Sequence, residues 1–140
     1  MSQKLNNLYE KYLTDMNVYY SIVPDKNYYL PNKGSYLIMD YKKMETLMNK
    51  NMPQNTKYIN LFDTLMLDNY YKSDGHWRQE TLKPVVDKLN HEMGNSAEFN
   101  IEEYEQKSYT PFYGAYYGQL ASMAKPDILI GSKIKLPVTR

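Results

Sequence analysis

The fold is decided by the stretch Val18-Tyr19-Tyr20-Ser21-Ile22-Val23-Pro24. Its first six residues are mostly β-branched or aromatic, a composition typical of a buried strand, and the proline stops the run. Just upstream, residues 3–12 place apolar or aromatic side chains at the spacing of one helix face. These side chains belong to Leu5, Leu8, Tyr9 and Tyr12. The sequence therefore predicts an amphipathic helix that is followed by a strand over residues 18–23.

A second helix and a second strand follow in the same order. Residues 24–34 contain two prolines, two asparagines and a glycine, which predicts an ordered loop after the first strand. Asp40 can cap a helix over residues 41–49, and Pro53 marks the end of that segment. The side chains expected to face inward from this helix are Met44, Leu47 and Met48. Residues 57–61 predict the second strand.

A third helix is predicted over residues 82–93, where apolar side chains again keep helical spacing. Gly94 directly follows and suits the left-handed conformation that ends many helices. Pro84 leaves two possible starts. Either the helix begins near residue 82 with this proline in its first turn, or it begins near Arg78 and bends at the proline.

The remaining segments carry weaker patterns. Residues 62–67 predict one or two helical turns, and residues 70–77 predict an irregular loop of polar and aromatic residues. Two further strands are predicted at 106–109 and 128–130, on either side of a small-residue helical stretch at 113–123.

Helices and strands alternate along the chain, and the connections are long enough to cross over a sheet. This order favours an α/β fold built on parallel strands, and 140 residues suit a single domain over residues 1–140. Two or three strands make a thin sheet, however, and parallel strands are normally buried on both faces. The sheet is therefore expected to be incomplete in this chain.

Composition and charge exclude several classes of protein. The formal net charge is +1, which argues against binding to nucleic acid or to an anionic membrane surface. No apolar run approaches the roughly 20 residues of a membrane-spanning helix, and the first residues lack a secretory signal, so the chain as written is expected to be soluble and not exported. The absence of cysteine excludes disulfides, thiolate catalysis and cysteine-ligated zinc, but it leaves the redox compartment open.

Tyrosine is unusually abundant, with 16 residues in the chain. A tyrosine ring can stack on a pyranose while its hydroxyl bonds to the rim of the sugar, so the composition suits a carbohydrate-binding cleft. Codon bias is the alternative explanation, because tyrosine, lysine and asparagine all have AT-rich codons. The count alone does not decide between the two.

The loop over residues 70–77 holds the best candidate for acid–base chemistry. His76 follows Asp74 by two residues, and an extended Asp-x-His sequence places both side chains on one side of the backbone. The carboxylate can then bond one ring nitrogen and leave the other as a base, with Trp77 packed beside the imidazole. The alternative is an ordinary polar pair at the protein surface.

Neither a metal site nor a nucleophile is evident. A metal held by Asp74 and His76 would need a third ligand, and His91 lacks a supporting motif, so we predict no metal site. None of the isolated serines lies in a Gly-x-Ser-x-Gly elbow, and the triplet Gly131-Ser132-Lys133 lacks the apolar strand-to-turn context that an elbow needs. These serines include Ser21, Ser35, Ser73, Ser108 and Ser122.

Three stretches together resemble the DHHW family, whose members are related to the alginate O-acetyltransferase-like branch of the SGNH hydrolases. Residues 21–29 (SIVPDKNYY) resemble its strand-and-loop signature, and residues 70–77 (YYKSDGHW) resemble its Asp-x-His-Trp block. Residues 112–118 (FYGAYYG) are similar to a weaker Phe-x-Gly-Ser block. Order and spacing agree over roughly residues 5–120. The sequence departs from the family at Gly75, where the family name has His, and at Ala115, where Ser is common.

The resemblance implies a three-layer, flavodoxin-like SGNH fold of which this chain is the N-terminal part. It also implies an O-acetyltransferase or carbohydrate esterase of the bacterial cell envelope, or a secreted one, whose substrate is an acetylated carbohydrate and which needs no cofactor. The catalytic pair would be Asp74 and His76, completed by a serine later in the chain than Arg140. Trp77 and Tyr71 would contact the substrate.

Lys26 is a further candidate for substrate binding, and a structural ion pair with Asp25 or Asp74 is the alternative for it. The alternative function is a non-catalytic module that binds carbohydrate or assists surface assembly through its tyrosine-rich loops. The reading frame after Arg140 would distinguish the two functions, because only the enzyme needs a serine block there. The oligomeric state is left open.

Overall fold

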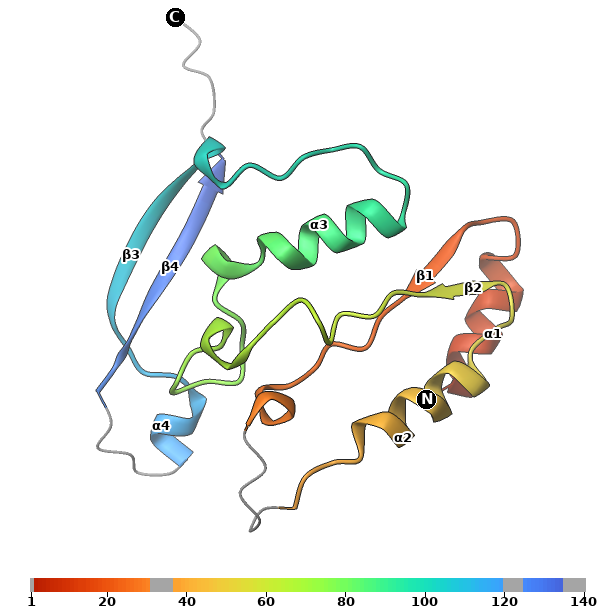
Figure 1. Cartoon of the computed structure of the whole chain (residues 1–140), viewed down its shortest axis with the longest axis horizontal. Helices are drawn as coiled ribbons and strands as arrows, with labels where there is room; N and C mark the ends of the chain where they lie inside the picture. Colours follow the sequence, from red (N-terminus) through yellow and green to blue (C-terminus); the bar gives the residue numbers. More distant parts are fainter. Residues whose placement is uncertain (1, 31–36, 120–124, 135–140) are drawn as a thin grey trace, which may run out of the picture. The chain divides into compact units, whose positions relative to one another are not determined.

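The computed structural model describes residues 2–30, 37–119 and 125–134. The chain divides into two compact units, Met1–Phe62 and Asp63–Arg140. Figure 1 shows the order of helices and strands along the chain.

The first unit contains two helices and two short parallel strands. Its elements are α1 (Ser2–Tyr12), β1 (Val18–Tyr20), the 3-10 turn η1 (Lys26–Tyr29), α2 (Tyr41–Asn51) and β2 (Thr56–Tyr58). β1 pairs with β2 in parallel, and α2 lies in the crossover between them, as a parallel connection requires. The rings of Tyr20 and Tyr58 at the end of the register lie 5.3 Å apart. The most buried side chains of this unit belong to Tyr9, Pro24, Ile59 and Leu61.

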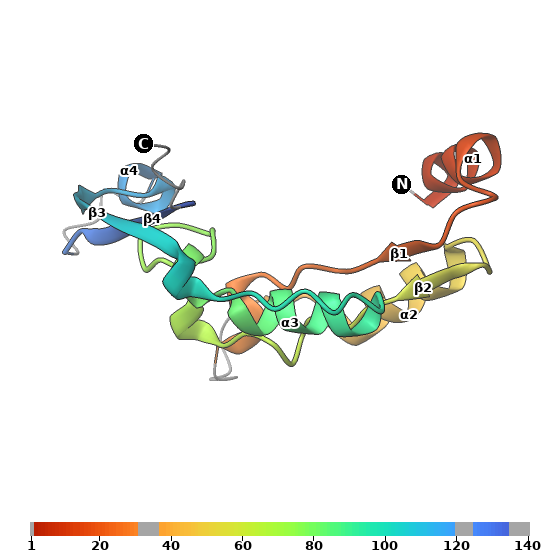
Figure 2. The same ribbon diagram turned by 90° about the horizontal axis from the view of Figure 1, so that it is seen from above.

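The second unit is built on one helix and an antiparallel pair of strands. Its elements are η2 (Leu67–Asn69), η3 (Gln79–Thr81), α3 (Lys83–Glu92), η4 (Ile101–Glu103), β3 (Tyr104–Phe112), α4 (Ala115–Gln119) and β4 (Asp127–Ile134). β3 and β4 run side by side as a ribbon, with α4 at the end where β4 begins (Figures 1 and 2). The buried side chains here include Leu65, Tyr70, Tyr71 and Val85.

The two strand pairs confirm the expected sheet only in part. β1 and β2 are parallel as predicted, but each is only three residues long, and the predicted ends at 23 and 61 extend past them. The later strands are longer than predicted and antiparallel, which contradicts a sheet of parallel strands throughout. Polar residues fill most of β3 and all its middle positions are exposed, so hydrophobic patterning could not reveal its length.

The predicted starts and ends of the helices agree more closely with the structure than the predicted strands do. Asp40 caps α2, since its Oδ1 accepts a hydrogen bond from the Lys43 backbone N–H at 2.9 Å. α3 starts with Pro84 in its first turn, which confirms the first of the two alternatives. Gly94 follows α3 with φ of 69°, the left-handed conformation that was expected. The prediction that Leu47 faces inward is wrong, because this residue is 51% exposed.

Two other helical predictions need correction. Residues 62–67 form a turn and not a helix, and the nearest helical turn is η2, which starts at Leu67. Of the helix predicted over residues 113–123, the structure describes the part that forms α4, and residues 120–124 lie outside the described part of the chain. The loop at 24–34 contains η1, and its residues 31–36 also lie outside that part. No helix that the structure describes is long and apolar enough to cross a membrane.

Candidate functional site

The loop between η2 and η3 folds back on itself. Tyr70 and Trp77 form an antiparallel bridge, and the backbone N–H of Tyr71 donates to the carbonyl of His76 at 3.2 Å. Residues 72–75 form the tip of this narrow loop. These backbone contacts between the two arms of the loop hold the segment that carries Asp74 and His76.

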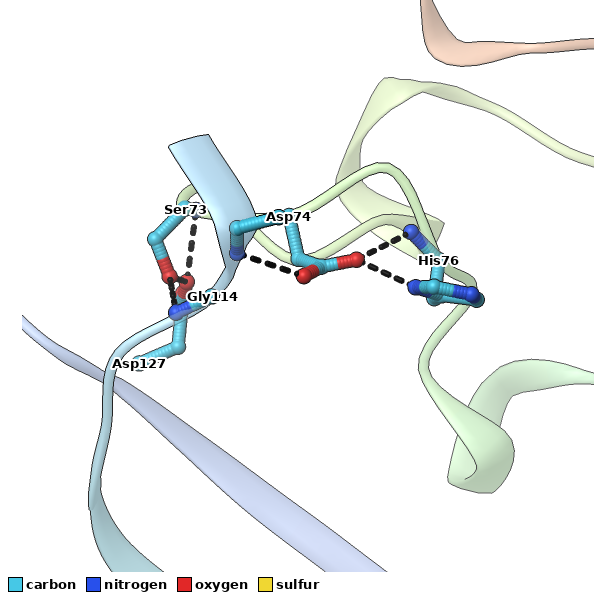
Figure 3. Close-up of polar contacts among 6 residues, drawn as sticks. Ser73, Asp74, His76, Gly114 and Asp127 are labelled. Carbon is cyan, nitrogen blue, oxygen red and sulfur yellow. Dashed lines mark hydrogen bonds and ion pairs between the residues drawn. The ribbon is translucent and has the colours of Figure 1, made fainter. Parts of the chain in front are cut away.

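The structure brings the Asp74 and His76 side chains into contact. Oδ1 of Asp74 is hydrogen-bonded to Nδ1 of His76 and also accepts from the His76 backbone N–H at 2.9 Å (Figure 3). The Asp74 side chain is 9% exposed, whereas the His76 side chain is 88% exposed. An ionised carboxylate can only accept, so the neutral imidazole carries its proton on Nδ1. Nε2 has no hydrogen-bond partner among the described residues and can act as a base.

The second oxygen of Asp74 is held by the start of α4. Oδ2 accepts a hydrogen bond from the backbone N–H of Ala115 at 2.8 Å. Burial acts to raise the pKa of Asp74, but the hydrogen bonds from Ala115 and His76 outweigh it and lower the pKa to about 2. The carboxylate is therefore ionised at neutral pH and fixed through both oxygens.

Gly114 allows this close approach. A Cβ at this position would lie 2.4 Å from the carbonyl oxygen of Ser73 and 2.5 Å from Cβ of Asp74. The backbone N–H of Tyr116 also donates to the Ser73 carbonyl at 3.0 Å. No side chain fits between the two segments, which explains why a glycine precedes Ala115.

Two residues that the sequence analysis did not assign to the site, Ser73 and Asp127, join these segments. Oδ2 of Asp127 accepts from the Ser73 backbone N–H at 2.7 Å and from the Ser73 hydroxyl at 2.6 Å. The same hydroxyl accepts from the Gly114 N–H at 3.1 Å, as Figure 3 shows. Burial acts to raise the pKa of Asp127, but the donors from Ser73 and Lys72 lower it overall. The sequence offered one sign that Ser73 belongs to the site, namely its position next to Asp74. No motif or spacing in the sequence pointed to Asp127.

The three residues predicted to contact substrate lie in different surroundings. Tyr71 is 3% exposed and packs edge-on against Phe112, with ring centroids 5.1 Å apart. Burial raises the pKa of the Tyr71 hydroxyl. Trp77 is half-buried, and Lys26 is a half-buried residue in η1 of the first unit. Their roles toward a substrate stay predictions.

His91, the remaining candidate ligand, is exposed near the end of α3. Within the ranges 2–30, 37–119 and 125–134, no three histidine or acidic side chains gather as they would around a metal ion.

Comparisons with known proteins identify similar folds but no similar sequence. No protein-family model matches the chain, and no curated protein matches it. A DHHW family protein from Eubacterium siraeum DSM 15702 is similar in structure with a TM-score of 0.76 and 18% identity, over 94% of this chain and 46% of that protein.

PatB1 from Bacillus cereus is also similar. Its structure with a sulfonyl adduct gives a TM-score of 0.66 at 18% identity, covering 96% of this chain and 48% of that one. A second PatB1 structure gives 0.64 at 17%, covering 96% and 49%. The chain thus spans about half the length of these proteins. At this identity the likeness establishes the fold alone: the chain is folded like the corresponding part of a DHHW family protein.

Proposed function

We propose that this chain carries the Asp–His pair of an SGNH-like serine acyltransferase or esterase that acts on O-acetyl groups of a surface or secreted carbohydrate. One observation carries the proposal. A buried, ionised Asp74 holds Nδ1 of His76 and leaves Nε2 exposed on the solvent side. This is the arrangement that a general base needs when a second side chain fixes its tautomer.

The proposed nucleophile is a serine that follows Arg140 in a longer protein. The chain spans about half of each similar structure, so there is room in such a protein for the missing part. One similar structure carries a sulfonyl adduct. A sulfonyl adduct is the covalent product expected when an activated nucleophile attacks a sulfonyl reagent, which supports covalent catalysis in proteins of this fold.

The proposed reaction has two steps, in which the serine is first acetylated and then released. His76 Nε2 takes the serine proton as the serine oxygen attacks the acetyl carbonyl. The bond from the acetyl carbon to the leaving oxygen then breaks, and that oxygen takes the proton from the imidazolium. In the second step a sugar hydroxyl or water loses its proton to Nε2 and attacks the acetyl-enzyme, which releases the serine with its proton restored.

Asp74 would serve both steps by stabilising the imidazolium. Its pKa of about 2 means that the carboxylate is charged at neutral pH and can stabilise a positive charge on the imidazole. Its bond to Ala115 keeps the carboxylate from rotating away from the ring. The contact between Oδ1 of Asp74 and Nδ1 of His76 then favours both the Nδ1-protonated tautomer of the neutral imidazole and the imidazolium.

The architecture follows from the same proposal. Residues 1–140 would be the N-terminal part of one larger catalytic domain, in which further strands extend β1 and β2 into the three-layer sheet of an SGNH fold. The likeness to a DHHW family protein over 94% of this chain supports this arrangement. A location at the cell envelope or outside the cell also belongs to the proposal, because the substrate would be there.

The test uses the reading frame extended past Arg140, treated with a sulfonyl fluoride and assayed with an acetylated sugar. We expect one labelled serine after residue 140, and Asp74→Asn should lower turnover by a factor on the order of 10⁴. Asp87→Asn, which removes an exposed carboxylate from α3, is the matched control. Residues 1–140 alone should hydrolyse no activated acetyl ester.

Near-wild-type turnover in Asp74→Asn would remove this residue from the mechanism. Binding of the glycan by the extended protein without any turnover would instead support the alternative of a non-catalytic carbohydrate-binding module. Hydrolysis by residues 1–140 that disappears in His76→Ala would reveal a nucleophile within this chain, and Ser132 would be the first residue to examine.

A further inference from the structure

The Ser73 hydroxyl forms a bridge between two segments that are distant in sequence. It donates to Oδ2 of Asp127 at 2.6 Å and accepts from the N–H of Gly114 at 3.1 Å. Ser73 is 7% exposed, so water does not readily replace either partner. The bridge therefore joins the loop tip, the start of α4 and the start of β4 through one oxygen atom (Figure 3).

Asp127 is the acceptor on which this bridge depends. Its two oxygens accept from the backbone N–H of Ser73 at 2.7 Å and from that of Lys72 at 3.2 Å, in addition to the hydroxyl. All three donors come from the two residues that directly precede Asp74. A carboxylate that receives several donors from consecutive residues fixes the path of that backbone.

The path of this backbone decides the contacts of Asp74. Oδ2 of Asp74 reaches the N–H of Ala115 only while the loop tip and Gly114 stay in close contact. If the bridge opened, the two segments could separate, and Oδ2 would lose its donor. The carboxylate could then rotate and release Nδ1 of His76.

We propose that Asp127 is a positioning residue, which acts through Ser73 to hold the Asp74 carboxylate between Ala115 and His76. This positioning role concerns only the contact between Asp74 and His76. The effect of Asp127 on turnover rests on the proposed function. Asp127 touches neither His76 nor a reacting atom in this role.

A titration of the Asp74 carboxyl carbon by NMR distinguishes positioning from simple charge. Asp127→Asn removes a neighbouring negative charge, which by itself would lower the pKa of Asp74 further. Loss of the Ala115 hydrogen bond acts in the opposite direction, since that bond is one of the contacts that hold the pKa at about 2. The direction of change therefore identifies the cause.

We expect the pKa of Asp74 to rise from about 2 to above 3 in Asp127→Asn, and nitrogen NMR to show the His76 proton moving from Nδ1 to a mixture of both ring nitrogens. Ser73→Ala breaks the same bridge without any change in charge and should give the same two changes. It is also the second variant if Asp127→Asn does not fold. Asp87→Asn on α3 should change neither signal.

An unchanged or lower pKa for Asp74 in both folded variants would overturn the proposal. In the protein extended past Arg140, both variants should lower kcat by about 10²-fold with little change in KM, because the base is displaced while the substrate contacts remain. The two proposals can fail separately. A shifted titration in an extended protein without activity would support the positioning role and contradict the proposed function.

Discussion

Gly114→Ala is the change that most directly tests the packing of the site. The added Cβ would lie 2.4 Å from the Ser73 oxygen, 2.7 Å from the Ser73 carbonyl carbon and 2.5 Å from Cβ of Asp74. Two of these neighbours are backbone atoms of a loop that is tied down on both sides. They cannot move aside as the free end of a side chain can, so the start of α4 must separate from the loop.

The expected loss of stability can be worked out from these contacts. Overpacking a tight contact costs about 1–3 kcal/mol. Separation would also weaken the hydrogen bond from Ala115 to the charged Asp74, and bonds of that kind contribute about 1.5–3 kcal/mol. A gain of about 0.4–1 kcal/mol comes from the less flexible unfolded chain. The net expectation is a loss of about 3 kcal/mol.

Two other glycines provide matched controls. Gly118, within α4, would have no atom within 4 Å of an added Cβ, so Gly118→Ala should be neutral or stabilise the helix by up to about 1 kcal/mol. At Gly75 the added Cβ would meet the side chain of Tyr116, 2.8 Å from its hydroxyl oxygen and 3.6 Å from its Cζ. These neighbours belong to a side chain and not to the backbone, so Gly75→Ala should cost less than Gly114→Ala.

Urea unfolding followed by fluorescence suits this series, because the one tryptophan of the sequence is Trp77 in the same loop. With a slope of about 2 kcal/mol per molar urea, the expected loss for Gly114→Ala lowers the midpoint by about 1.5 M. The reasoning is refuted if Gly114→Ala and Gly118→Ala unfold at the same urea concentration.

Two further predictions concern acid and the end of α3. The pKa of Asp74 is lower in the folded state than its ordinary value of 3.8, so its contribution of about 2 kcal/mol is fully present above pH 5 and is lost as the pH falls through 3.8 toward 2. Urea unfolding between pH 6 and pH 2.5 should show this loss, and Asp74→Asn should reduce the pH dependence; equal slopes in both proteins would contradict it. At Gly94, where φ is 69° and nothing lies within 4 Å of an added Cβ, Gly94→Ala should cost about 1 kcal/mol and Gly94→Asn less. Thermal unfolding would disprove this if alanine and asparagine destabilised α3 equally.

The features that sequence predicted correctly are those decided by neighbouring residues. Asp40 caps α2 through a backbone N–H three residues away, and Gly94 ends α3 by its own conformation. The contact of Asp74 with His76 spans two residues, so the spacing alone could suggest it. In each case the relevant atoms are joined by a short stretch of chain with few possible conformations.

The features that sequence missed depend on contacts between distant segments. Ala115 lies 41 residues from Asp74, and Asp127 lies 54 residues from Ser73. Neither partner has a residue type or spacing that marks it. The length of β3 was underestimated for a related reason: its middle positions are all exposed, so no alternation of polar and apolar residues records its pairing with β4.

Gly75 and Ala115, the two positions at which the sequence departs from the DHHW resemblance, have different local surroundings. Asp74 takes its hydrogen bond from the N–H of residue 115, so the contact does not depend on whether alanine or serine occupies that position. Gly114 is different, because any side chain there would collide with Ser73. At Gly75 the missing side chain leaves space that the Tyr116 hydroxyl occupies. In this chain the contact between the start of α4 and the loop tip therefore requires a glycine at residue 114, whereas residue 115 takes part through its backbone N–H.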